Sequence, residues 1–197
     1  MNFQDIQELH YITHIGNVPS ICKCGILSHK QAGDVSHVSV ASPDVQERRA
    51  KKIIPGGLPL HAYVNLYFDA RNPMMYVLQA KHADLCILQI DPVVMNLSGA
   101  IVSDRNASSD YARFFPCPDG LMRLDAEMIF ATSWTHPNNQ FDEWEHKSIK
   151  CAEVLVPDKV VPKYLLGAYV SCNEALNSFQ KTNVSVSVIV KPYIFFS

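Results

Sequence analysis

The stretch that decides the fold is residues 146–157, which read His-Lys-Ser-Ile-Lys-Cys-Ala-Glu-Val-Leu-Val-Pro. Apolar and β-branched residues dominate positions 151–156 and a proline follows them, so this run is predicted to form a short buried strand. Successive side chains of a strand point to opposite faces, and Glu153 therefore shares a face with Cys151 and Leu155. Both faces are otherwise apolar, which singles out Glu153.

A carboxylate in such a strand must give up its hydration, and this costs free energy unless the group has a partner or a chemical task. Two interpretations of Glu153 follow. It is either a structural residue paired with a lysine or arginine, or a functional residue of a site. Its position in the sequence alone favours the structural interpretation.

Length and composition predict one globular domain spanning residues 1–197, with 48% hydrophobic and 18% charged residues. The formal net charge of -2 excludes a uniformly basic protein, so any contact with nucleic acid has to come from a local patch. No apolar run approaches the length of a membrane span, and the first residues lack the features of a signal peptide. We expect a soluble, cytoplasmic monomer with reduced cysteines and no membrane contact.

The first predicted strand, residues 9–15, leads into a short helix. Its composition is that of a strand, and Gly16 breaks it. Asn17 is expected to cap a helix at residues 18–24, and Gly25 stands in the position that ends helices. The predicted order is strand, turn, short helix and glycine stop.

No metal site is predicted. His10 and His14 lie four positions apart, but on a strand this spacing separates them by roughly 13 Å, too far for both to bind one ion. Cys22 and Cys24 lack the two-residue gap of zinc knuckles, and no matching second pair follows them.

Residues 42–53 are predicted to form a helix, with Ser42 as its cap and a proline at its first position. Arg49 lies four positions after Val45 and four before Ile53, so it belongs to the apolar stripe of this helix. Arg49 is therefore predicted to point inward, where a guanidinium favours a phosphate or a carboxylate.

The rest of the chain reads as short strands, helices and loops. Strand composition covers residues 60–68, 83–90 and 184–190, a helix is expected at 173–180, and 137–145 is predicted to form a polar loop. The predicted fold class is therefore α+β with many short strands.

An aromatic and basic neighbourhood follows the polar loop of residues 102–109. Tyr111 and two phenylalanines stand close to Arg113 and Arg123. Such a mixture can stack bases and hold phosphates, although aromatic residues at this spacing belong more often to a core.

Four groups of residues form a further pattern that spans nearly the whole chain. In order they are Tyr-Ile-Thr-His-Ile-Gly-Asn-Val-Pro-Ser-Ile from Tyr11, Glu-Arg-Arg-Ala from Glu47, Leu-His-Ala-Tyr-Val-Asn-Leu-Tyr-Phe from Leu60 with Pro-Met-Met from Pro73, and Cys-Ala-Glu-Val-Leu-Val from Cys151. Together they resemble the DarT family of DNA ADP-ribosyltransferase toxins. The resemblance implies an ADP-ribosyltransferase-like fold, in which two packed antiparallel or mixed β-sheets with peripheral helices surround an NAD cleft.

The resemblance also implies roles for individual residues. The family's catalytic glutamate falls on Glu153 and its active-site arginine on Arg49. The residues implied to bind NAD are Thr13, His14, Ile15, Gly25 and Arg49, and residues 33–49 match the element that covers NAD. The residues implied to bind single-stranded DNA are Met75, Arg105, Asn106, Tyr111 and Arg113.

The implied chemistry fits these residue types. Cleavage of the nicotinamide–ribose bond develops oxocarbenium charge, which Glu153 would stabilise while it hydrogen-bonds the ribose hydroxyls. The attacking atom would be a base nitrogen of single-stranded DNA. Because a guanidinium almost never deprotonates, Arg49 is expected to bind pyrophosphate or to stabilise a deprotonated base. NAD would be consumed as a co-substrate without a metal, and a DarG-type macrodomain antitoxin would hold the toxin in check.

Asn106 departs from the family pattern, since some members carry a histidine there. Asparagine cannot shuttle a proton near neutral pH, so a histidine-dependent proton transfer does not carry over to this chain. The family contains thymine-modifying and guanine-modifying branches, and the asparagine inclines the expectation slightly to guanine.

Two other functions stay open. An ADP-ribosyltransferase that acts on RNA ends or on protein would leave single-stranded DNA unmodified. A non-catalytic module that binds NAD or nucleic acid would turn over no NAD, although the presence of Glu153 and Arg49 argues against it.

Overall fold

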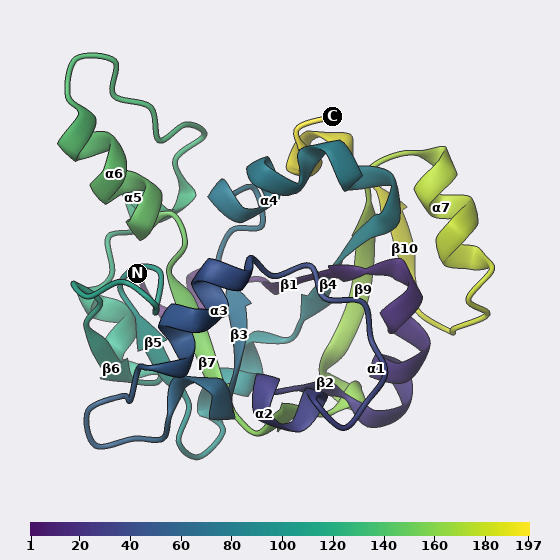
Figure 1. Ribbon diagram of the computed structural model, residues 1–197, viewed down its shortest axis with the longest axis horizontal. Coiled ribbons are helices and arrows are strands. Elements are labelled where there is room, and N and C mark those ends of the chain that lie inside the picture. Colours follow the sequence, from purple (N-terminus) through teal and green to yellow (C-terminus); the bar gives the residue numbers. More distant parts are fainter.

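Eight strands hydrogen-bond in one series in the computed structural model, which describes all 197 residues (Figure 1). Only one of its strand pairs is parallel, that between the first two strands of the series. A second, two-stranded sheet joins β2 (Ile26–Leu27) to β8 (Lys159–Val160). The series runs β10 (Val188–Val190), β9 (Leu165–Val170), β4 (Leu85–Ile90), β1 (Leu9–His14), β3 (Tyr63–Tyr67), β7 (Glu153–Pro157), β5 (Ile101–Ser103) and β6 (Phe114–Pro116).

The large sheet is almost divided at its middle. β1 and β3 pair at one position only, His10 opposite Tyr67, whereas β1 with β4 and β3 with β7 pair along their length. The sheet therefore consists of two four-stranded halves, β10-β9-β4-β1 and β3-β7-β5-β6. The sequence analysis expected two sheets, and the structure joins these two halves into one eight-stranded sheet through a single residue pair. The α+β class is confirmed. Glu153 faces Tyr67 across the β3–β7 pair, right at the junction.

Alternation along β3 and β7 separates two apolar clusters. Val154 and Val156 of β7 lie in the larger cluster, together with Leu66 of β3. Tyr67 and Cys151 lie in a second cluster. The predicted alternation around Glu153 is confirmed, because Cys151 and Leu155, which share its face of the strand, lie outside the larger cluster.

The helices complete both clusters. Residues of α1 and α7 pack into the larger cluster, whereas Met75 of α4 and Phe195 near the C-terminus pack into the second one. None of the helices is both long enough and apolar enough to cross a membrane. The helices are α1 (Val18–Cys24), α2 (His29–Ala32), α3 (Pro43–Ala50), α4 (Pro73–Leu78), α5 (Ala126–Phe130), α6 (Gln140–Ile149) and α7 (Asn173–Gln180), with short 3-10 helices at Phe3–Asp5, Ile15–Asn17, Leu60–Ala62, Gln79–Asp84, Pro92–Asn96, Asp119–Arg123, Pro162–Tyr164 and Pro192–Phe195.

Most predicted elements are present, and the largest error concerns residues 137–145. The predicted bounds of α1 and α7 are confirmed. The predicted polar loop is wrong, because α6 begins at Gln140. The Asn139 side chain accepts hydrogen bonds from the backbone N–H groups of Phe141 and Asp142, which is a helix cap that the sequence analysis overlooked.

Two other predicted elements are shorter than expected. The strand predicted at 184–190 is reduced to β10 at its end, and the helix predicted at 42–53 ends at Ala50. Asn17 does occupy the cap position of α1, but its side chain makes no capping hydrogen bond.

A buried polar network lies beside the junction of the two half-sheets. Glu8 accepts hydrogen bonds from the Tyr169 hydroxyl at 2.9 and 3.1 Å and from Gln89. His10 places one ring nitrogen 3.0 Å from Glu8 and the other 3.2 Å from the carbonyl oxygen of Phe68. Burial raises the pKa of Glu8, but hydrogen bonds from His10, Gln89 and Tyr169 outweigh it and lower the pKa from 4.5 to about 2.

We expect Glu8→Gln to lose stability in a pH-dependent way. Because the folded-state pKa is lowered, the contribution of the ionised carboxylate is present above pH 4.5 and is lost as the pH falls towards 2. The difference in free energy of unfolding between wild type and variant, measured by urea denaturation, should shrink over that interval. Glu47→Gln is the control, since the exposed pair of Glu47 with Lys51 contributes little at any pH. A difference that stays constant down to pH 2 would contradict this account.

Gly25 is required where α1 ends. Its φ of 88° suits glycine, and a Cβ there would lie 2.4 Å from the carbonyl oxygen of Val160. We expect Gly25→Ala to lower the free energy of unfolding by at least about 2 kcal/mol. Gly56→Ala is the matched control, because Gly56 also has a positive φ of 69° but a Cβ there meets nothing within 4 Å, so its cost should be about 1 kcal/mol. If Gly25→Ala and Gly56→Ala lower the free energy of unfolding equally, the close contact with Val160 does not contribute to the requirement for glycine at position 25.

Candidate active site

Glu153 is fully buried at the start of β7 and its carboxylate is completely paired. Oε1 accepts a hydrogen bond from the backbone N–H of Ala107 at 3.0 Å. Oε1 and Oε2 lie 3.2 and 3.0 Å from Nη1 of Arg49. These three contacts satisfy the requirement that a buried charge be paired and hydrogen-bonded.

Arg49 reaches Glu153 from the last turn of α3 and is 5% exposed. The inward direction predicted from the helical stripe is confirmed, while the preceding Arg48 is exposed. Only Nη1 contacts Glu153, and the other N–H groups of the guanidinium form no hydrogen bond within the protein. Arg49 can therefore hold the carboxylate and still donate to a ligand.

The turn between α6 and β7 is fixed by a buried lysine. The side chain of Lys150 is fully buried, pairs with Asp69 and donates to the carbonyl oxygen of Ile129 at 2.9 Å. The loop that carries Ala107 is tied to the end of α6, because the N–H of Asn106 donates to the carbonyl oxygen of Ser148 at 2.8 Å. These bonds fix the turn that precedes Glu153 and the loop that carries Ala107.

Besides Arg49, Glu153 has two ionisable neighbours that stay uncharged near neutral pH, Tyr67 and Cys151. Burial, followed by the charge of Glu153, raises the pKa of Tyr67 well above its usual value. The same two causes raise the pKa of Cys151 to about 12. Cys151 is thus not a nucleophile at neutral pH, since thiols react as thiolates.

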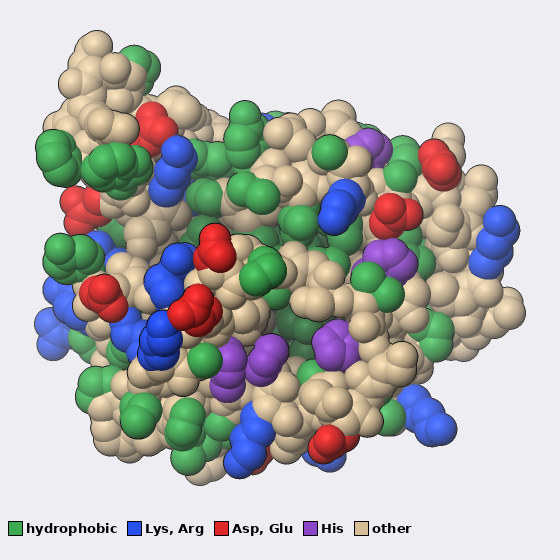
Figure 2. Space-filling model, viewed as in Figure 1, with side chains coloured by type: hydrophobic (Ala, Val, Ile, Leu, Met, Phe, Trp, Pro, Cys, Tyr) green, Lys and Arg blue, Asp and Glu red, His purple; other side chains and the backbone are tan.

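Histidine side chains gather around a hollow on the face that carries α3 (Figure 2). The rings of His29 and His61 lie 4.0 Å apart between centroids. Burial first, and then the charges of neighbouring histidines and of Arg49, lower the pKa of both rings. They are therefore neutral at pH 7 and can donate or accept hydrogen bonds beside Arg49.

The residues predicted to bind NAD lie in different settings. Thr13 is 3% exposed and its hydroxyl accepts a hydrogen bond from Asn17 at 3.1 Å. Nδ1 of His14 accepts from the N–H of Gly16 at 2.9 Å, so Nε2 is the nitrogen that carries the proton in the neutral ring. Ile15 is a residue of the larger apolar cluster, and Gly25 packs against Val160.

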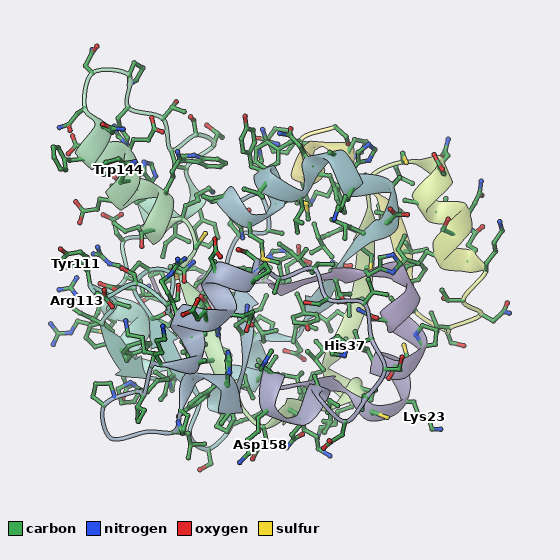
Figure 3. The ribbon with its side chains drawn as sticks, viewed as in Figure 1. Lys23, His37, Tyr111, Arg113, Trp144 and Asp158 are labelled. Carbon is green, nitrogen blue, oxygen red and sulfur yellow. The ribbon has the colours of Figure 1, made fainter.

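The residues predicted to bind DNA are only partly grouped. Tyr111 is 81% exposed, and Figure 3 places it with Arg113 and Trp144 along one edge of the molecule. Arg105 and Arg113 both contact Asp104, at 3.3 and 2.8 Å. The side chain of Arg113 is 67% exposed, but that of Arg105 is 13% exposed.

Met75 is fully buried in the second apolar cluster and offers no surface to a DNA strand. The match to the family's motif gave no indication of this burial, which depends on how α4 packs.

A cleft of about 330 Å³ opens beside the Glu153 strand. Its wall contains Asn106, which was predicted to bind DNA, and Cys151, two residues before Glu153. The sequence analysis missed its other residues, which are Arg48, Pro73, Ser108, Ser109, Trp144, Lys147 and Ser148. Several of these belong to α6, so recognition of the Asn139 cap would have pointed to them.

Known proteins resemble this chain in sequence over most of its length. A family model described as "ssDNA thymidine ADP-ribosyltransferase, DarT" matches residues 10–196. The chain belongs to the DarT family. A DNA ADP-ribosyl transferase–glycohydrolase fusion protein from Thermosipho africanus is 31% identical over 98% of this chain, which spans 50% of that relative. A DNA ADP-ribosyl transferase from Thermus sp. strain 2.9 is 33% identical over 66% of this chain and 67% of its own length.

Solved DarT structures have the same fold. Thermus sp. 2.9 DarT in complex with ADP-ribosylated ssDNA matches with a TM-score of 0.82 and 25% identity over 99% of both chains. Thermosipho africanus DarTG in complex with ADP-ribose matches with a TM-score of 0.82 and 29% identity, over 96% of this chain and 51% of that one. The ADP-ribosyltransferase-like fold expected from the sequence is confirmed. No group of three or more His, Cys, Asp or Glu side chains in this DarT chain is placed to hold a metal ion.

The burial of the Arg49–Glu153 pair predicts strong coupling between the two residues. Glu153→Gln keeps an acceptor for Ala107 but leaves a buried guanidinium without its counter-charge, and we expect a loss of about 3–5 kcal/mol in free energy of unfolding. The double variant Arg49→Met/Glu153→Gln should recover part of this loss, because no unpaired charge remains. Urea denaturation of wild type, Arg49→Met, Glu153→Gln and the double variant gives the coupling free energy. Additive effects would mean that the pair is solvated in solution.

Proposed function

We propose that this chain is a DarT-type toxin that transfers ADP-ribose from NAD to a base of single-stranded DNA and releases nicotinamide. The observation that carries the proposal is the fully buried Glu153 carboxylate held by Arg49 and Ala107 at the head of β7. The solved relatives support it, since Thermus sp. 2.9 DarT has been captured with ADP-ribosylated ssDNA and with carba-NAD+.

Glu153 would stabilise the developing positive charge of the sugar. In the proposed reaction the bond between nicotinamide and ribose C1 breaks, and nicotinamide leaves with the bonding electrons. A base nitrogen bonds to C1 and loses its proton to solvent. A carboxylate that is already stripped of water interacts strongly with such an oxocarbenium centre, and it can accept hydrogen bonds from the ribose hydroxyls. Burial of Glu153 thus serves the chemistry as well as the fold.

Arg49 would act as a permanent cation at the site. Its guanidinium stays protonated, so it cannot take the proton that the base loses. Its N–H groups beyond Nη1 are free to donate to the pyrophosphate of NAD or to a deprotonated base. Either contact would give Arg49 a new negatively charged partner when Glu153 interacts with the sugar.

The cleft beside Cys151 is the proposed place of the acceptor base. Trp144 is 54% exposed and offers a stacking surface, and Lys147 and Arg48 supply positive charge for phosphates. Tyr111 and Arg113 would continue this surface along the DNA strand. Arg105 and Met75 are less suited to direct contact, because both are largely buried.

Asn106 faces the cleft in a fixed orientation. Its Oδ1 accepts from the N–H and the hydroxyl of Ser108 at 2.9 and 2.8 Å, so its Nδ2 is the group left for a ligand. A donor there fits a base carbonyl oxygen, which both thymine and guanine carry. The asparagine in place of histidine inclines our proposal to guanine, whereas the description of the matching family model names thymidine.

We further propose a DarG-type macrodomain antitoxin as the partner and the cytoplasm as the place of action. The Thermosipho africanus relative supports the pairing, because it combines a DNA ADP-ribosyl transferase and a DNA ADP-ribosyl glycohydrolase in one chain. Residues 1–197 are proposed to act as one domain and as a monomer.

Intact-mass analysis of single-stranded oligonucleotides tests this function. Wild type, Glu153→Gln and the exposed control Glu174→Gln are incubated with NAD and four oligonucleotides, each lacking one base. We expect an ADP-ribose addition with wild type and the control, and a loss of at least about 100-fold with Glu153→Gln. The oligonucleotide that stays unmodified, together with fragmentation of the products, identifies the base.

The two alternative functions give different results in the same experiment. Modification of RNA or protein with no product on any DNA would replace the proposed substrate. Binding of NAD without turnover on any acceptor would favour a non-catalytic module.

A further inference from the structure

One ten-residue segment, residues 33–42, crosses in front of the strands between α2 and α3 (Figure 1). We call it the strap. It leads directly into α3, the helix that carries Arg49. Most of its residues are exposed, including Val38 at 50% and His37, which Figure 3 labels on this segment. Its apolar contact with the core comes from Val40, which packs against the second cluster.

The strap has one hydrogen-bonded anchor in its middle. Among residues 36–41, the bonds of His37 to Val35 and of Ala41 to Ser39 stay within the segment. The two bonds that join residues 36–41 to the rest of the protein both connect the backbone of Val38 with the side chain of Asn17. An exposed segment with so few bonds opens easily, so this anchor controls its position.

Asn17 uses its whole amide for this contact. Its Oδ1 accepts from the N–H of Val38 at 2.9 Å and its Nδ2 donates to the carbonyl oxygen of Val38 at 2.9 Å. The same Nδ2 donates to the hydroxyl of Thr13 at 3.1 Å. The amide therefore imitates a paired strand residue, and it joins the strap to the end of β1, where Thr13 and His14 lie.

The Asn17 side chain binds the strap although it stands at the cap position of a helix. It stands at the cap of α1, where an asparagine side chain ordinarily accepts from the first turn of its helix, yet no such bond is present. The side chain is committed to a segment 21 residues away instead. Capping therefore does not account for an asparagine at this position, whereas the strap does.

We propose that Asn17 is a positioning residue for NAD, which holds the strap in the place it must occupy to cover the dinucleotide. The inference rests on the proposed function, because residues 33–49 match the family element that covers NAD. Asn17 acts through Val38 and Thr13 and does not touch the reacting atoms. Without it, binding of NAD has to order the strap, and affinity falls while the chemical step is unchanged.

Steady-state kinetics and hydrogen exchange together test the proposal. We expect Asn17→Ala to raise KM for NAD roughly tenfold, as the loss of its two modest hydrogen bonds to the strap implies, with kcat within about twofold of wild type. Amide exchange of residues 33–42 without NAD should accelerate, with no change elsewhere. Asn17→Asp keeps the acceptor for the Val38 N–H but loses the hydrogen bonds donated to Val38 and Thr13. Its KM for NAD should therefore lie between those of wild type and Asn17→Ala. Asn177→Ala, at an exposed position on α7, is the matched control.

The outcomes separate this inference from the proposed function. An unchanged KM with unchanged strap exchange would overturn the role of Asn17, even if wild type modifies DNA. A rise in exchange throughout the chain would also overturn it, because Asn17 would then support the fold in general. If no DNA is modified, titration of wild type and Asn17→Ala with carba-NAD+ still decides the matter, and equal affinities would refute it.

Discussion

The buried contact between Arg49 and Glu153 is the constraint on which the rest of the site depends. A carboxylate with no exposed surface has to be matched by a cation, and the cation comes from a helix 104 residues earlier in the chain. The α3 helix must therefore pack over the junction of the half-sheets, and the loop at Ala107 must turn its N–H towards the same oxygen. Both segments would lose a buried partner if this carboxylate were removed.

The ionisable side chains next to Arg49 and Glu153 carry no charge of their own near neutral pH. Tyr67 and Cys151 remain protonated beside Glu153, and His29 and His61 remain neutral beside Arg49. One positive and one negative group are thus left in a largely dry environment, where their fields are least screened. Such a site suits the proposed substrate, because NAD brings a sugar that becomes cationic and phosphates that are anionic.

The elements around Glu153 divide the work of the proposed reaction between two sides. The strap, held by Asn17 over the end of β1, belongs to the side of the proposed NAD contacts. The cleft lined by α6 and by Asn106 belongs to the side of the proposed acceptor. Glu153 lies at the junction of the two half-sheets, which pair at one position there. The narrow junction allows both sides to approach one carboxylate.

The sequence by itself determined the elements whose signals are local. Alternation predicted the faces of β7, and helical spacing predicted that Arg49 points inward. The bounds of α1 and α7 were also predicted from the residues of those segments alone. The resemblance to the DarT family pointed to Glu153 and Arg49 as the proposed catalytic pair. The tertiary structure alone decided their pairing, because a contact across 104 residues leaves no periodic trace in the chain.

The same reason explains what was missed. The strap contact of Asn17 competes with a local cap, and the burial of Met75 depends on how α4 packs. Local sequence patterns predict which face of a helix or strand a residue occupies. Which residues pack against that face depends on the tertiary structure.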